Sequence, residues 1–149
     1  MKILLQRVSA ASVEVAGTCV GKIGTGLLAF VGVESGDGDA QADWLADKTL
    51  GLRIFADEDV GDNGKAMNRS VLDVAGEILV VSQFTLAADT SKGRRPGFST
   101  AASPARAKQL YERYITNLRR EATIQTGQFG ADMQVALVND GPVTFLLER

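Results

Sequence analysis

Runs of apolar, β-branched residues dominate this chain, and their composition is typical of strands rather than helices. Strand-like runs lie at residues 3–15, 19–33, 52–55, 77–86, 135–138 and 143–147. The run at 19–33 is predicted to form two strands around the turn Gly24-Thr25-Gly26. The stretches between the runs are short polar loops, except for longer ones at residues 56–68 and 87–100.

Two segments have a helical pattern instead. From about Ala40, with Asp39 as the candidate N-cap, one face collects Ala42, Leu45, Ala46 and Thr49. The pair Ser103-Pro104 is a typical helix start, with Ser as the cap and Pro at the first helical position. The stripe that follows is interpreted as core packing and consists of Ala107, Leu110, Tyr111, Tyr114 and Leu118. The predicted fold is a single α+β domain over residues 1–149, with a largely antiparallel, barrel-like sheet and two main helices.

Composition narrows the functional classes. The chain has 149 residues, 45% hydrophobic and 23% charged, which suits one globular domain. A net charge of −2 provides no overall basic field for nucleic acid, so any RNA contact must come from local patches. The start has too short an apolar stretch for a signal peptide, no run reaches membrane-spanning length, and Cys19 is the only cysteine. We therefore expect a soluble, cytoplasmic protein.

The sequence contains no histidine. Ser–His and Cys–His nucleophile pairs therefore cannot form, and a zinc site is improbable with one cysteine. Acid–base chemistry would fall to carboxylates, hydroxyls, backbone amides or the substrate itself.

Two segments carry the candidate chemistry. The first is "SQFTLAAD", residues 82–89. A purely structural strand would have Val or Ile where this segment has Ser82, Gln83 and Thr85, although these side chains could simply form hydrogen bonds with backbone groups. In "NDGPVT", residues 139–144, the simplest interpretation is a hairpin turn between two strands. Pro142 fits that turn poorly, because proline lacks the N–H that a ladder needs and restricts the residue before it.

With these two segments the chain resembles the D-aminoacyl-tRNA deacylase family from end to end. Similar stretches are "QRVSAASVEV", "GLLAFVGV", "LRIF", "VVSQFTLAAD", "KGRRPGF" and "TGQFGADMQVALVNDGPVTF". The paired Ser-Gln-Phe-Thr and Gly-Pro-Val-Thr motifs are the family's hallmark. Two loops depart from the family pattern: this chain has "GKAMN" where the family usually has Gly-Lys-Met-Asn, and Gly97 where a serine is common.

The resemblance implies a homodimer with active sites at the subunit interface, acting on the acceptor end of aminoacyl-tRNA. Gly141-Pro142 would form a cis peptide that enters the partner's pocket, where its carbonyls obstruct the side chain of an L-amino acid. D-amino acids and glycine would escape that clash. Neither a membrane nor DNA is expected as a partner.

The resemblance also implies roles for individual residues. The 2′-hydroxyl of the terminal adenosine would assist hydrolysis, while Ser82, Gln83 and Thr85 shape and orient the pocket. Phe84 would pack beneath the pocket, and neither a metal nor a cofactor would be required. The residues implied in substrate binding are Phe84, Met133, Gly141, Pro142 and Thr144.

The residues alone leave two other functions open. Thr85 or Ser82 could be the nucleophile of a small-ester hydrolase, provided that a Lys, Asp or Glu serves as base. The protein could instead be a non-catalytic dimer that binds RNA or nucleotides. The cations available for phosphates in that case are Lys92, Arg94, Arg95, Arg119 and Arg120.

Overall fold

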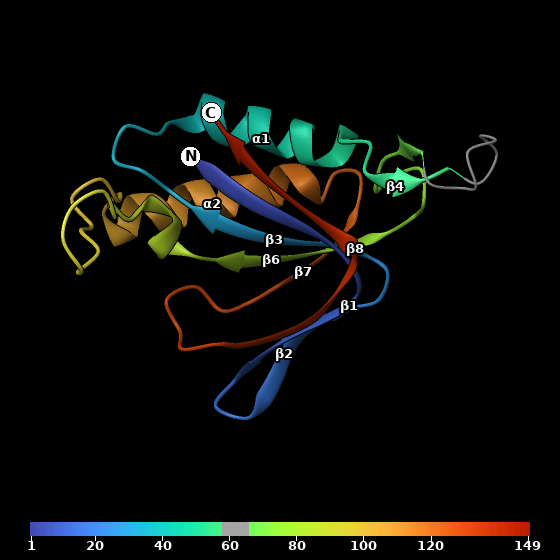
Figure 1. Cartoon of the computed structure of the whole chain (residues 1–149), viewed down its shortest axis with the longest axis horizontal. Helices are drawn as coiled ribbons and strands as arrows, with labels where there is room; N and C mark the ends of the chain where they lie inside the picture. Colours follow the sequence, from blue (N-terminus) through green and yellow to red (C-terminus); the bar gives the residue numbers. More distant parts are fainter. Residues whose placement is uncertain (58–65) are drawn as a thin grey trace.

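The computed structural model describes residues 1–57 and 66–149, which form a six-stranded sheet, a small two-stranded sheet and two α-helices (Figure 1). The large sheet contains β1 (Lys2–Val15), β2 (Thr18–Ile23), β3 (Gly26–Gly32), β6 (Glu77–Ser82), β7 (Thr123–Thr126) and β8 (Gln134–Glu148). The helices are α1 (Asp39–Gly51) and α2 (Pro104–Leu118), and η1 (Phe84–Ala87) is a short 3₁₀ turn. The single α+β domain is confirmed.

The long strand β1 organises the antiparallel part of the sheet. The two strands predicted around Gly24-Thr25-Gly26 are confirmed, and both pair with β1. Ala11 pairs with Ile23 and Val8 with Gly26, so β2 and β3 follow one another along the same edge. Strand β8 runs antiparallel to β1 over nearly its whole length.

The remaining strands are parallel. Strand β6 pairs with β3, and β7 pairs with β6. The sheet curls until β2 approaches β7, where a Cβ on Gly21 would lie 2.8 Å from the backbone oxygen of Thr126. This curvature gives the barrel-like shape that the sequence predicts.

The sheet is buried on both faces. Alternate residues of β6 point to opposite sides, so Ile78 and Val80 join one apolar cluster while Leu79 and Val81 join another. The first cluster packs against α1 and α2, which cover one face of the sheet (Figure 1). The second fills the concave side of the curled sheet.

Both helices bury the predicted faces. Ala42, Leu45, Ala46 and Thr49 of α1 are buried, as are Leu110, Tyr111, Tyr114 and Leu118 of α2, with Ala107 packed against them. Ser103 caps α2 by accepting a hydrogen bond from the backbone N–H of Arg106 at 3.4 Å. The predicted cap of α1 is wrong by one residue: Gly38 is the N-cap, and its N–H donates to the side chain of Gln41 at 3.0 Å.

Two predicted elements differ in extent. The strand expected at 52–55 is limited to β4 (Phe55–Ala56), which pairs with β5 (Met67–Arg69), a strand that begins within the loop expected at 56–68. The rest of that loop, residues 58–65 with the first two residues of "GKAMN", lies outside the described residues. The loop at 87–100 is confirmed. In the described part of the chain, no helix is both long and apolar enough to cross a bilayer.

The strand predicted for residues 77–86 is too long. Strand β6 ends at Ser82, and the N–H of Gln83 donates to the carbonyl oxygen of Val31 at 2.7 Å. The chain then turns, because the N–H of Leu86 donates back to the carbonyl oxygen of Gln83 at 3.2 Å. The "SQFT" segment therefore lies at the point where a strand becomes a turn.

Candidate active site

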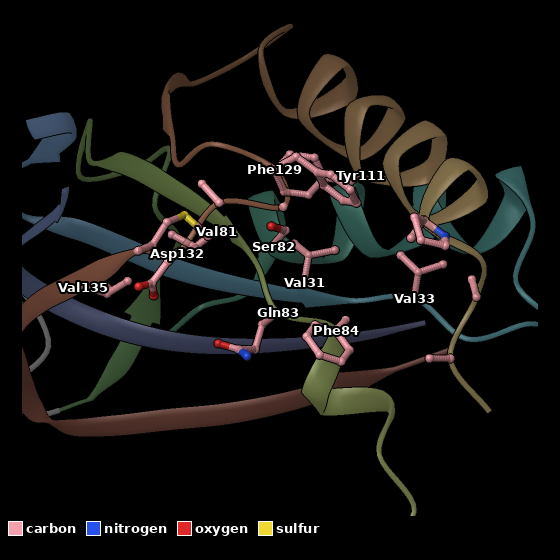
Figure 2. A pocket seen from close by; sticks show the side chains of 17 residues that line it. Val31, Val33, Val81, Ser82, Gln83, Phe84, Tyr111, Phe129, Asp132 and Val135 are labelled. Carbon is pink, nitrogen blue, oxygen red and sulfur yellow. The ribbon is translucent and has the colours of Figure 1, made fainter. Parts of the chain in front are cut away.

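A pocket of about 430 Å³ opens at the carboxyl end of β6 (Figure 2). Because β3 and β6 are parallel, their carboxyl ends meet at one edge of the sheet, where Val31 and Ser82 lie side by side in the ladder. The start of α2 and residues 129–135 complete the lining. The pocket is therefore built from segments that are far apart in the sequence.

Several predicted site residues meet in this pocket. Ser82, Gln83, Phe84 and Met133 all contribute to its lining. Thr85 follows directly and is exposed, and its hydroxyl accepts a hydrogen bond from the Gln83 side-chain amide at 2.5 Å. Phe84 differs from the expectation, since it is 60% exposed at the mouth rather than packed beneath the pocket.

The inner wall is aromatic. The rings of Tyr111 and Phe129 pack with their centroids 5.5 Å apart, and the Tyr111 hydroxyl donates to the carbonyl oxygen of Val80 at 3.0 Å. Burial raises the pKa of Tyr111 to about 12, further from physiological pH than the ordinary value for a tyrosine. Tyr111 was predicted as core packing alone, and it also forms part of the pocket.

The surroundings of the Thr85 hydroxyl bear on whether it can act as a nucleophile. Among the described residues, the only hydrogen-bond partner of the Thr85 hydroxyl is the Gln83 amide, which cannot act as a base. The charged residue of the lining is Asp132, whose side chain is exposed. Across residues 1–57 and 66–149, His, Cys, Asp and Glu side chains nowhere gather in groups of three that could hold a metal ion.

The Gly141-Pro142 segment lies on one continuous strand. The hairpin interpretation of residues 135–147 is therefore wrong, because β8 pairs with β1 on both sides of the motif. Val8 pairs with Asn139 and Gln6 pairs with Thr144, so residues 140–143 bulge out opposite Arg7. The Gly141–Pro142 peptide bond is cis, the form that the resemblance implies.

Polar side chains hold this bulge in place. The Nε of Arg7 donates to the backbone oxygen of Asp140 at 3.0 Å, and its Nη1 donates to the backbone oxygen of Ile54 at 2.6 Å. Inside the bulge, the Asn139 side chain accepts from the N–H of Val143 at 2.8 Å and donates to the Thr144 hydroxyl at 2.9 Å. Thr144 is thus part of the bracing of the bulge.

The bulge lies away from the pocket of its own chain. Gly141 and Pro142 are exposed and, like Thr144 and Thr85, do not belong to the lining that the described residues form. Within the described residues, β8 pairs only with β1, so its other edge is free. Along this strand, Val138, Phe145 and Leu146 are 59%, 38% and 52% exposed.

Known proteins match this sequence over nearly its whole length. The sequence model of the D-Tyr-tRNA(Tyr) deacylase family matches residues 4–148. A D-aminoacyl-tRNA deacylase of Pelobacter propionicus is 52% identical over 150 residues, with both chains fully covered. A D-aminoacyl-tRNA deacylase of Haemophilus influenzae is 57% identical over 144 residues, which cover 97% of this chain and 96% of the relative.

Solved structures have the same architecture. The c-Myc DNA Unwinding Element Binding Protein superposes with a TM-score of 0.92 at 39% identity, covering 100% of this chain and 99% of that one. A probable eukaryotic D-amino acid tRNA deacylase superposes with a TM-score of 0.84 at 17% identity, covering 98% of this chain and 97% of that one. At this identity the likeness shows only that the fold is the same. From its sequence over almost the whole length, this chain belongs to the D-Tyr-tRNA(Tyr) deacylase family.

Proposed function

We propose that this protein is a D-aminoacyl-tRNA deacylase, which hydrolyses the ester between a D-amino acid and the terminal adenosine of tRNA. One observation carries the proposal: the two hallmark segments occupy different surfaces of the chain. Ser82, Gln83 and Phe84 of the "SQFT" segment line the pocket, whereas the Gly141-Pro142 bulge projects, exposed, from an edge strand. Such a division suits a site that two subunits complete together.

The proposed assembly is a homodimer in which the bulge of one subunit enters the pocket of the other. The free edge of β8 and its exposed Val138, Phe145 and Leu146 support this arrangement, because a long uncovered edge strand with apolar side chains is prone to association. A second copy of the chain would cover that surface. It would also bring Gly141 close to the partner's Ser82, Gln83 and Phe84.

The bulge would set the stereochemical preference. The backbone carbonyls of Gly141 and Pro142 would occupy the space on one side of the substrate's α-carbon, where the side chain of an L-amino acid must project. D-amino acids place only hydrogen there, and glycine has hydrogen on both sides. The same site would therefore also clear glycine from mischarged tRNA, and its task in the cytoplasm would be proofreading of aminoacyl-tRNA.

In the proposed reaction, water attacks the ester carbonyl carbon with help from the 2′-hydroxyl of the terminal ribose. The bond between the carbonyl carbon and the ribose 3′-oxygen breaks, the 3′-oxygen takes up a proton, and the amino acid leaves as the free acid. Ser82, Gln83 and Thr85 orient the ester, and backbone N–H groups at the start of η1 stabilise the developing negative charge. The absence of a base beside Thr85 among the described residues favours this scheme over a threonine nucleophile.

One experiment separates the candidate functions. The purified protein is incubated with D-tyrosyl-tRNA and, separately, with D-tyrosine ethyl ester. A deacylase of the proposed kind releases tyrosine from the tRNA and leaves the ethyl ester, which has no ribose hydroxyl. Turnover of the ethyl ester would indicate a small-ester hydrolase, and binding of the tRNA without release would indicate an RNA-binding dimer.

A further inference from the structure

A loop of residues 88–100, here called the basic loop, connects η1 to α2 at the mouth of the pocket. Asp89 and Gly97 close it by exchanging two backbone hydrogen bonds of 2.8 Å each, and Thr100 accepts a hydrogen bond from the N–H of Ser35 at 2.9 Å. Figure 1 shows this loop, in yellow, projecting beyond the N-terminal end of α2. Its base is fixed and its tip extends into solvent.

The tip of the basic loop carries three exposed cations. Lys92, Arg94 and Arg95 make no hydrogen bond or ion pair with any residue that the structure describes. The acid of the loop, Asp89, accepts a hydrogen bond from the N–H of Ser91 at 2.9 Å instead. By contrast, the exposed Arg113 pairs with the carboxylate of Asp43 at 2.6 Å, so the charges of the loop cations, unlike that of Arg113, remain available for an anionic ligand.

An exposed aromatic pair lies between these cations and the pocket. Phe98, in the basic loop, contacts Phe84 with the ring centroids 5.1 Å apart, and the two residues are 41% and 60% exposed. Phe84 is also a lining residue at the mouth of the pocket (Figure 2). Cations beside exposed aromatic rings are the combination that binds single-stranded nucleic acid, through phosphates and stacked bases.

We propose that the basic loop binds the single-stranded 3′ end of tRNA where it enters the pocket. Lys92, Arg94 and Arg95 contact the phosphates that precede the terminal nucleoside, and the exposed face of Phe98 stacks on a base. A pocket of about 430 Å³ holds an aminoacyl nucleoside at most, so the preceding phosphates must cross its rim. This inference rests on the proposed function and adds to it a second contact region outside the pocket.

The test compares two pairs of neighbouring arginines. Arg94→Gln/Arg95→Gln removes two charges from the basic loop, and the matched control Arg119→Gln/Arg120→Gln removes two exposed charges at the far end of α2. Each enzyme is assayed with D-tyrosyl-tRNA and with D-tyrosyl-adenosine, which has the ester and terminal nucleoside but no phosphates. This small substrate reports on the pocket alone.

The loop variant is expected to raise KM for D-tyrosyl-tRNA and to leave turnover of D-tyrosyl-adenosine unchanged. The slope of log KM against log salt concentration should become shallower by about 0.7 for each phosphate that the variant loop no longer neutralises. The control pair should leave both substrates unchanged. Equal behaviour of the two arginine pairs, or an equal loss on both substrates, would overturn the proposal.

Phe98 offers a second, independent variant. Phe98→Ala should raise KM for D-tyrosyl-tRNA about tenfold because the base can no longer stack, while Phe98→Tyr should behave as the wild type. A loss that appears equally with D-tyrosyl-adenosine would mean that Phe98 only supports Phe84, and would contradict a contact with tRNA. Failure of the proposed function can be distinguished from failure of the loop contact, because in the first case the wild type would hydrolyse neither D-tyrosyl-tRNA nor D-tyrosyl-adenosine.

Discussion

Arg7 and Asp140 are joined across the β1–β8 ladder at the point where that ladder is interrupted. The Nε of Arg7 donates to the backbone oxygen of Asp140 at 3.0 Å and lies 3.2 Å from its carboxylate. The other end of the guanidinium donates to the backbone oxygen of Ile54 at 2.6 Å. The Arg7 side chain therefore links Asp140, the residue before Gly141, to Ile54, the residue before β4.

Replacing Arg7 by Lys should impair deacylation without unfolding the protein. An ammonium is a single point charge and cannot reach both Asp140 and Ile54 in the way that the guanidinium fork does. A bulge displaced by about 1 Å should lower kcat/KM by roughly a hundredfold. The matched control is Arg113→Lys, which changes an arginine that joins α2 to Asp43 of α1, and wild-type turnover of Arg7→Lys would show that the brace is dispensable.

Gly141→Ala should be more damaging than an alanine at an unconstrained glycine. Gly141 has φ of +134°, and an added Cβ would lie 2.7 Å from the Val143 side chain and 2.9 Å from Nη2 of Arg7. Alanine at this φ is strained, which costs about 1–3 kcal/mol, and the Val143 and Arg7 side chains or the backbone must move to make room for the methyl group. We expect a marked loss of activity on D-substrates, measured as kcat/KM on folded protein.

The control for this substitution is Gly36→Ala, since an added Cβ there meets nothing within 4 Å. It should leave both activity and thermal stability unchanged. If Gly141→Ala were as active as Gly36→Ala, the close approach of this backbone to a substrate would have no support.

Leu146→Glu should weaken the dimer and deacylation together. Leu146 is 52% exposed on the edge strand, and a carboxylate placed inside an apolar interface would be desolvated without a partner. Sedimentation at micromolar concentration should show a dimer for the wild type and a monomer for the variant. Val20→Glu, at a residue 39% exposed on β2, is the control that should remain dimeric, and a fully active monomer would refute a site shared between subunits.

Thr85→Ala should retain deacylation within about tenfold of the wild type. The substitution removes a hydroxyl whose described partner is the Gln83 amide, whereas loss of a true nucleophile typically costs about a millionfold. Single-turnover assays with D-tyrosyl-tRNA measure the difference. A tRNA that ends in 2′-deoxyadenosine and is charged at the 3′ position should be a poor substrate for both enzymes, and its normal turnover would contradict assistance by the ribose.

Local features of the sequence were sufficient to predict the helices. The cap Ser103 and the stripe that includes Tyr114 depend on residues only three or four positions apart, so both could be predicted. The cap of α1 was misplaced because the side chain of Gln41 reaches back to Gly38, a choice that the sequence leaves open. The end of β6 was missed because the apolar and β-branched composition of residues 84–86 is typical of a strand, whereas the N–H of Leu86 donates back to Gln83 in a turn.

For the candidate site too, the local motifs could be predicted, whereas their arrangement in space could not. The importance of Ser82–Phe84 and of Gly141-Pro142 was predicted through the family resemblance, but their separation on the surface depends on the β1–β8 register, which joins opposite ends of the chain. Arg7 was missed, although the sequence does contain a signal. Ile3 and Leu5 alternate into the core, and a charged residue two positions further on falls in the same phase of the strand.

The most direct test of the account is the ratio of D- to L-tyrosyl-tRNA hydrolysis by the wild-type dimer, measured on the same tRNA under the same conditions. A deacylase with a backbone obstacle beside the substrate's α-carbon should release D-tyrosine and leave the L-ester at its spontaneous rate. Equal hydrolysis of the two esters, or hydrolysis of neither, would contradict the account.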